Sequence, residues 1–86
     1  MGMKRLQEYL DFRAYLIDES MRRSMLPAGF SQRRFLQKAG IKSPSLFKQV
    51  IDGDRNLTAE TTEKFIIGLG LEGDDAQFFR HLVGFS

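Results

Sequence analysis

Apolar side chains recur along the chain at the three- and four-residue intervals typical of α-helices, and no segment shows the alternation typical of a β-strand. Glycine, proline and capping residues divide this pattern into segments. They predict a first helix ending near residue 25, a second between Ser31 and Gly40, a third over about residues 44–52, a fourth between Thr58 and Gly70, and a fifth from Gly73 onward. The sequence therefore predicts an all-α fold, a compact five-helix bundle in a single domain over residues 1–86.

Capping residues set the expected ends of these helices. Two starts stay open for the first helix: the apolar spacing begins near Arg5, whereas Asp11 is a suitable N-cap that leaves the first ten residues as a separate turn or arm. Ser31 is expected to cap the second helix, with the phenylalanine before it covering the entry. Ser43 and Pro44 are expected to be the N-cap and the first residue of the third helix.

The second and third predicted helices, joined by a short turn, form the pattern of a helix-turn-helix motif over about residues 31–52. A helix ~10–12 Å in diameter fits the major groove of DNA, where base edges offer donors and acceptors. Ala39 and Gly40 are expected at the crossing of the two helices, where side chains must be small. Ser45, Lys48 and Gln49 fall on the polar side of the third helix, where they can hydrogen-bond base edges.

The segment over residues 30–71 resembles the phage-repressor (XRE-type) family of helix-turn-helix domains. The matching features are the Ser31-Gln32 opening of the second helix, the Ala39-Gly40 hinge, the loop Gly53-Asp54-Arg55-Asn56 and the segment Leu69-Gly70-Leu71. One departure is that Gly40 and Gly53 are one residue further apart than is usual in repressors, which indicates an insertion around Lys42-Ser43.

More narrowly, the chain is similar to the N-terminal region of a family of poorly characterised bacterial proteins that carry a longer C-terminal region. The flanking residues that match are Tyr9-Leu10-Asp11-Phe12-Arg13, Phe78-Phe79, Leu82-Val83 and Phe85. These resemblances imply a lambda-repressor-like fold and the DNA-binding module of a bacterial transcriptional regulator. They also imply a C-terminal region absent from this chain.

The resemblance also implies roles for individual residues. The implied base contacts are Ser43, Ser45, Lys48 and Gln49, and the implied phosphate contacts are Gln32, Arg33, Arg34, Lys42, Arg55, Asn56 and Thr58. The alternative for the basic residues is that they are ordinary solvated charges on helix faces. The expected partner is double-stranded DNA, bound by a homodimer that reads two half-sites.

Charge is distributed unevenly along the chain, whose net charge is +2. Residues 1–42 hold nine Lys or Arg against four acidic residues, whereas residues 43–86 hold four against seven. This asymmetry favours an anionic partner for the first half. Asp52 and Asp54, which lie beside the expected docking surface and repel phosphate, instead favour an alternative function as a protein–protein interaction module of the same fold.

Other functions find little support in the sequence. There is no cysteine, no signal-peptide pattern and no apolar run approaching the ~18–20 residues that span a bilayer, so we expect a cytoplasmic protein with no membrane partner. The acidic residues at 52, 54 and 63, with Asn56, have the spacing of a calcium loop, but Leu57 occupies the position that requires glycine. His81 is the single histidine and has no nucleophile beside it. We therefore expect no metal, no cofactor and no enzymatic activity.

The last apolar stripe, which consists of Phe78, Phe79, Leu82 and Val83, has the spacing of one helix face. We expect it to belong to the core. The alternative is a face that docks a dimer partner or the missing C-terminal region.

Overall fold

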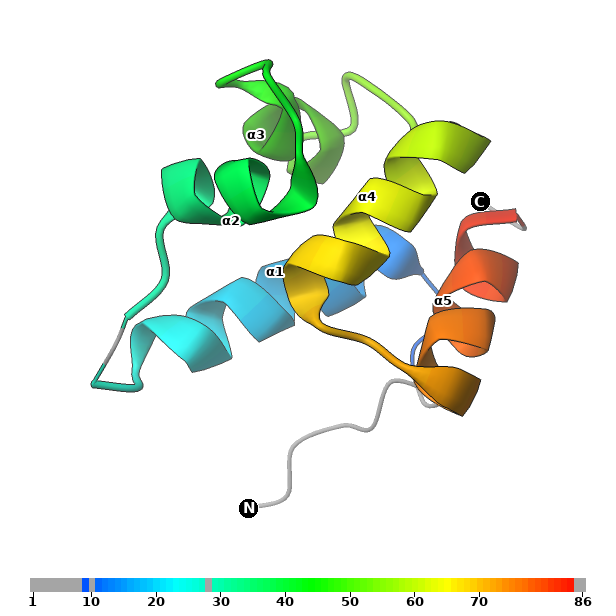
Figure 1. Ribbon diagram of the computed structural model, residues 1–86, viewed down its shortest axis with the longest axis horizontal. Helices are drawn as coiled ribbons and strands as arrows, with labels where there is room; N and C mark the ends of the chain where they lie inside the picture. The colour runs from blue at the N-terminus through cyan, green and yellow to red at the C-terminus, as the bar shows by residue number, and fades with distance from the viewer. Residues whose placement is uncertain (1–8, 10, 28, 85–86) are drawn as a thin grey trace.

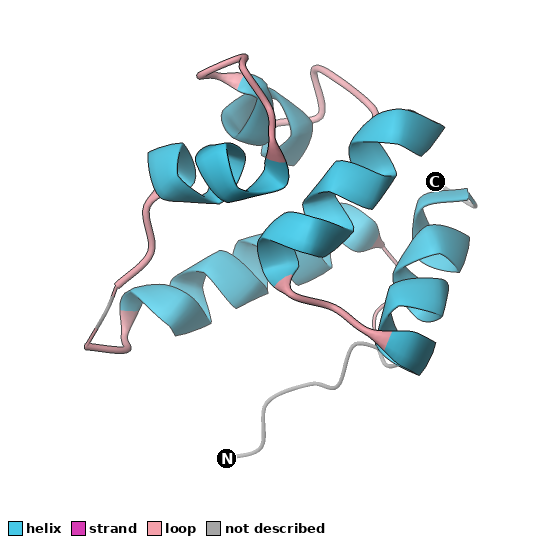
Figure 2. Ribbon diagram, in the orientation of Figure 1, coloured by secondary structure: helices cyan, strands magenta, loops and turns pink. Residues whose placement is uncertain are grey.

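The computed structural model describes Tyr9, residues 11–27 and residues 29–84 (Figure 1). These residues form five α-helices and no strand (Figure 2), which confirms the all-α prediction. The helices are α1 (Phe12–Ser24), α2 (Gln32–Ala39), α3 (Leu46–Ile51), α4 (Ala59–Leu69) and α5 (Gly73–Gly84). None of the described helices has both the length and the apolarity needed to cross a bilayer.

The helices pack in pairs around one core. α2 lies on α4 and α3 lies on α1, while α5 contacts both α1 and α4. As a result α2 and α3 sit at one end of the molecule and α5 at the other (Figure 1). The radius of gyration is 12.2 Å, close to the ~12 Å expected for a globular chain of this length.

Helix α1 begins after Asp11, so the later of the two predicted starts is correct. The Asp11 carboxylate accepts a hydrogen bond from the Arg13 backbone N–H at 3.0 Å, which satisfies one of the unpaired donors of the first turn. Tyr9 lies before the helix and is buried, and its hydroxyl donates to Asp18 Oδ2 at 2.8 Å. The rest of the predicted N-terminal turn or arm lies outside the described residues.

The predicted caps of α2 and α4 are confirmed. Ser31 Oγ accepts from the Arg34 backbone N–H, and the Phe30 ring packs against Phe35 at a centroid distance of 6.2 Å, the arrangement of a hydrophobic staple. Thr58 forms a capping box with Thr61 at the start of α4. Gly40 and Gly70 end the two helices in the left-handed conformation, which glycine adopts without steric cost.

Helix α3 is shorter than predicted, and the expected start at Ser43 and Pro44 is wrong. Residues 44–45 form a turn, Ser45 occupies the N-cap position without a side-chain hydrogen bond, and the helix has only six residues. Ile41 is packed against the core directly after α2, and Leu46 is the next buried residue. The residues between them are needed to connect these two anchors, so packing overrides the local preference of Ser-Pro for starting a helix.

The core is rich in aromatic rings that touch across helices. Phe35 of α2 contacts Phe47 of α3 at 5.1 Å and Phe65 of α4 at 5.0 Å between ring centroids. Tyr15 of α1 contacts Phe79 of α5 at 6.0 Å. Edge-on ring pairs of this kind add stability beyond that of the area they bury.

The stripe on α5 belongs to this core, as expected. Phe79 and Leu82 are buried, and Phe78 and Val83 are partly buried against the same cluster.

The close approach that needs small residues is between α2 and α4, whereas the sequence predicted it between α2 and α3. A Cβ built on Gly68 of α4 would stand 2.7 Å from Phe35 Cε1 and 3.1 Å from the Ala39 side chain, so Ala39 faces α4 rather than α3. A Cβ built on Gly40 would meet nothing within 4 Å. Gly40 is therefore required for its φ of 76° and not for a close approach of α2 and α3.

Candidate nucleic-acid interface

The predicted contact residues lie on α2, the α2–α3 connection, α3 and the loop before α4. Most of them are exposed: Gln32, Arg33, Arg34, Lys42, Ser45, Lys48, Arg55, Asn56 and Thr58. Ser43 and Gln49 are half-buried. The structure therefore leaves most of the predicted set accessible to a partner.

Unpaired cations are concentrated in this region. Among the described residues, the side chains of Arg33, Arg34, Lys38, Lys42 and Arg55 form no hydrogen bond or ion pair. Every other described lysine or arginine has a partner within the molecule: Arg13, Arg22, Arg23, Lys48, Lys64 and Arg80. The unpaired positive charge is thus carried by α2, the connection that follows it, and the loop after α3.

The N-terminus of α2 is suited to an anion. Its first turn contains Gln32, Arg33 and Arg34 and no acidic residue, and Ser31 uses one of the free backbone N–H groups. The remaining N–H groups and the positive end of the helix dipole favour negative charge. Arg33 and Lys42 line one hollow together with Pro44, so the start of α2 and the α2–α3 connection are brought together.

The outward face of α3 carries a weak internal ion pair. Lys48 Nζ lies 3.1 Å from Asp52 Oδ2, and the two side chains are 71% and 46% exposed. An exposed pair of this kind contributes little to stability, so Lys48 can exchange Asp52 for another anion. Ser45 is exposed at the N-terminal end of the same helix.

Gln49 is less available than the other predicted base contacts. Its Oε1 is buried and has no hydrogen-bond partner among the described residues. The acceptor end of this amide is therefore turned away from solvent, which leaves Ser45 and Lys48 as the exposed members of that group, while Ser43 is half-buried.

Two predicted phosphate contacts are partly used inside the molecule. Asn56 Oδ1 accepts a hydrogen bond from the Arg13 guanidinium. Thr58 Oγ1 accepts from the Thr61 backbone N–H at 3.2 Å, and the Thr58 N–H donates to Thr61 Oγ1 at 2.7 Å. At this end of the surface, the Arg55 side chain is the predicted contact that stays without an internal partner.

The structural role of Arg13 was not predicted. Its Nε donates to the Val50 carbonyl at 2.8 Å and its Nη2 to the Arg55 carbonyl at 3.1 Å, in addition to the Asn56 amide. The guanidinium thereby joins the start of α1 to the end of α3 and the loop that follows. The sequence shows Arg13 only as one basic residue among nine in the first half, because its acceptors are backbone carbonyls some 40 residues away.

Residues of the segment with calcium-loop spacing have structural roles at the ends of α3 and α4 instead. Asp52 pairs with Lys48, and Thr58 caps α4. Within the described part of the chain, no three His, Cys, Asp or Glu side chains come together in a way that could hold a metal ion.

Comparison of the chain with protein-family models, with curated proteins and with solved structures finds no match. The resemblance to repressor-type domains therefore stays a prediction from the sequence.

Proposed function

We propose that this chain is a sequence-specific, double-stranded DNA-binding module of the helix-turn-helix type, in which α2 and α3 are the two helices of the motif. The observation that carries the proposal is the clustering of unpaired cations. Arg33, Arg34, Lys38, Lys42 and Arg55 surround the α2–α3 unit, while every other described cation is neutralised or held internally. A set of cations left without partners is the electrostatic footprint of a polyanion site.

The arrangement suggests how a duplex is held. The N-terminus of α2, with Gln32 and Arg33, meets one stretch of phosphates together with Lys42, and Arg55 meets another beyond α3. Ser45 and Lys48 then face the base edges in the major groove. Arg13 fixes the position of α3 and the Arg55 loop relative to α1, which sets the spacing between the two phosphate contacts.

The short α3 limits how much sequence one chain can read. Six residues span ~9 Å along the helix axis. Such a helix contacts only a few base pairs, so useful specificity requires two copies on two half-sites. This fits a lambda-repressor-like domain of a bacterial transcriptional regulator.

A second candidate function is a protein–protein interaction module of the same fold. The observation that favours it is the Lys48–Asp52 pair, which places a carboxylate on the face proposed to enter the groove. A partner protein tolerates such a mixed-charge face better than a duplex does.

Fluorescence anisotropy with a labelled mixed-sequence duplex, measured over a salt series, tests the DNA-binding proposal. We expect binding at low salt whose affinity falls steeply as salt rises, because phosphate contacts release counterions. The double variant Arg33→Gln/Lys42→Gln should weaken binding about tenfold or more and reduce the salt slope by about 2.

The matched control is Lys64→Gln/Arg80→Gln, which removes the same net charge from exposed ion pairs on α4 and α5. It should leave affinity within about twofold of the parent chain. Equal losses in both double variants would show a response to net charge alone. The absence of binding at low salt would favour the interaction module.

A further inference from the structure

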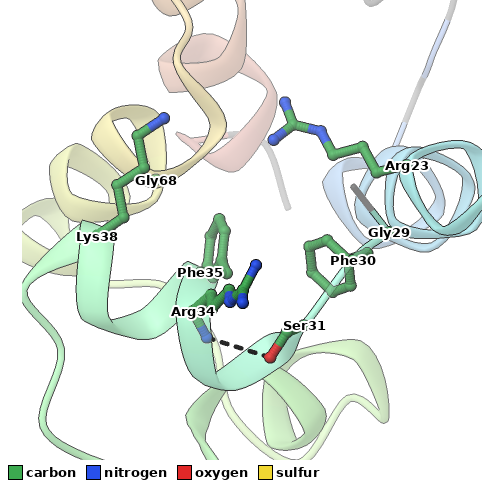
Figure 3. A pocket seen from close by; sticks show the side chains of 8 residues that line it. All are labelled: Arg23, Gly29, Phe30, Ser31, Arg34, Phe35, Lys38 and Gly68. Atoms are coloured by element: carbon green, nitrogen blue, oxygen red, sulfur yellow. Dashed lines mark hydrogen bonds between the residues drawn. The ribbon is translucent and has the colours of Figure 1, made fainter. Parts of the chain in front are cut away.

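A hollow of about 180 Å³ lies between α2, the end of α1 and the end of α4 (Figure 3). Arg34 and Lys38 line it from α2, and Arg23 lines it from α1. Phe30 and Phe35 form its apolar part, and Gly68 of α4 completes the wall. It is separate from the hollow that contains Arg33 and Lys42, which lies on the flank of α2 next to the α2–α3 connection.

The charge around this hollow is positive and largely uncompensated. Arg34 and Lys38 are one turn apart on α2, and neither side chain has a partner among the described residues. None of the described residues that line the hollow is acidic. Of the three cations, Arg23 alone is paired, with the Glu19 carboxylate that it shares with Arg22.

Arg23 is held in place by the fold. Its Nη2 donates to the Leu69 carbonyl at 2.7 Å, at the C-terminus of α4, and its Nε donates to Glu19 at 2.8 Å. One charged group of the hollow is therefore fixed in position before any ligand arrives, which reduces the entropy cost of binding.

The apolar part of the hollow is also rigid. The Phe35 ring is 5% exposed and packed against the rings of Phe47 and Phe65, and the half-buried Phe30 contacts it. Since Gly68 has no side chain, the Phe35 ring packs directly against the α4 backbone. A flat apolar group can lie against these rings while an anionic group reaches the cations at the rim.

We propose that this hollow binds a small organic anion with a flat apolar body, of the aromatic carboxylate class. A carboxylate matches the planar fork of an arginine guanidinium, and a ring matches the phenylalanine surface. The volume lies below the ~300–1,000 Å³ typical of sites for larger ligands, so the occupant is of single-ring size. This proposal goes beyond DNA binding and does not depend on it.

Titration of the ¹⁵N-labelled chain with benzoate, followed by amide chemical shifts in the absence of DNA, tests the site. We expect saturable shifts confined to the amides of residues 29–38 and 68–70, with a dissociation constant on the order of 1 mM for this small probe. Benzyl alcohol, which lacks the charge, and inorganic phosphate, which lacks the ring, should each bind at least tenfold more weakly.

Two double variants with the same change in net charge distinguish the hollow lined by Arg34 and Lys38 from the hollow lined by Arg33 and Lys42. Arg34→Gln/Lys38→Gln should weaken benzoate binding at least tenfold, whereas Arg33→Gln/Lys42→Gln should leave it within twofold. All four positions are exposed, so both variants should keep the parent melting temperature. Phosphate binding as tightly as benzoate, equal losses in the two variants, or shifts that do not saturate or that map elsewhere would overturn the proposal. Because no DNA is present, none of these results bears on the function of α3.

Discussion

The Arg13 side chain connects parts of the chain that the sequence keeps far apart. It donates to the carbonyls of Val50 and Arg55 and to the Asn56 amide, so one guanidinium satisfies acceptors on α3 and on the loop that leads to α4. The guanidinium also lies over the Phe12 ring, with its carbon 4.8 Å from the ring centre. The side chain thus adds to the loop's own backbone hydrogen bonds, in which the N–H groups of Asp54 and Arg55 donate to the Gln49 carbonyl at 2.9 and 3.2 Å.

Replacing Arg13 with glutamine should loosen this loop. We expect Arg13→Gln to lower the free energy of unfolding by ~1–3 kcal/mol, because hydrogen bonds from a charged donor are lost. Amides of residues 53–58 should exchange with deuterium faster than those of α4. Arg80→Gln, which removes an exposed arginine, is the control and should leave exchange in the loop unchanged. Unchanged exchange in Arg13→Gln would show that the loop is held by other contacts.

Glu19 makes the stability of the fold depend on pH. Burial raises the pKa of this carboxyl, but hydrogen bonds from Arg22 and Arg23 outweigh burial and hold the pKa below its ordinary value. A group whose pKa is lowered by folding contributes stability above the pKa of the unfolded chain, and this contribution is lost as the pH falls through the folded pKa. The contribution should therefore be complete at neutral pH and disappear in acid.

Glu19→Gln should lower the free energy of unfolding by ~1–3 kcal/mol at pH 7. The difference from the parent chain should shrink as the pH falls below the ordinary carboxyl pKa of 4.5. Urea denaturation at several pH values measures it. Glu60→Gln is the control, because the Glu60 side chain is 79% exposed in its pair with Lys64. A difference that stays constant with pH would exclude the carboxylate charge as its cause.

Side-chain roles of this kind could not be read from the sequence. Arg13 and Arg33 are both basic residues near the start of a predicted helix, and local pattern does not distinguish them. The fold does, because the partners of Arg13 come from α3 and the following loop while Arg33 faces solvent. The predicted phosphate contacts therefore include Asn56, although its side-chain Oδ1 already accepts a hydrogen bond from Arg13.

At the scale of helices, the sequence predicts the starts that local capping residues determine, those of α1, α2 and α4. It does not predict the start of α3, which packing determines. Caps at Asp11, Ser31 and Thr58 act within three residues, so they are visible in the sequence. The start of α3 depends instead on where Leu46 can reach the core, and this position is set by helices distant in sequence. The short α3 follows from that tertiary constraint.

The crossing of α2 and α4 should be sensitive to a single methyl group. Gly68→Ala adds a Cβ 2.7 Å from Phe35 Cε1, and the buried Phe35 ring is packed against the rings of Phe47 and Phe65. Alanine is the better helix former, yet we expect a net loss of ~1–2 kcal/mol in the free energy of unfolding because of overpacking.

The matched control is Gly84→Ala at the end of α5, where an added Cβ meets nothing within 4 Å. It should be neutral or stabilise by up to ~1 kcal/mol. Thermal and urea denaturation of both variants decide the point. A stabilising Gly68→Ala would show that α2 and α4 can move apart at little cost.

At the scale of the whole molecule, charge is segregated. The unpaired cations belong to α2, the α2–α3 connection and the Arg55 loop. The acidic residues Glu72, Asp74 and Asp75 lie at the start of α5 and in the loop before it. A molecule with such a distribution presents one end to an anion even though its net charge is only +2.

This segregation predicts that the affinity for DNA depends more on the position of a charge than on the net charge of the molecule. Asp52→Asn and Glu72→Gln each remove one negative charge. Asp52 lies at the end of α3 and pairs with Lys48, whereas Glu72 lies in the loop between α4 and α5, at the opposite end of the molecule (Figure 1). Asp52→Asn removes a repulsion from the proposed duplex face and frees Lys48, so it should tighten DNA binding about three- to tenfold at low salt.

Glu72→Gln should change the affinity by less than about twofold at 0.1 M salt, because Glu72 is exposed in the loop between α4 and α5 and the Debye length of ~10 Å limits the reach of its charge. The difference between the two variants should narrow as salt is raised in the anisotropy assay. Equal gains would mean that binding follows net charge alone. Weaker binding by Asp52→Asn would mean that the Lys48–Asp52 pair itself belongs to the recognition surface, as an interaction with a protein partner requires.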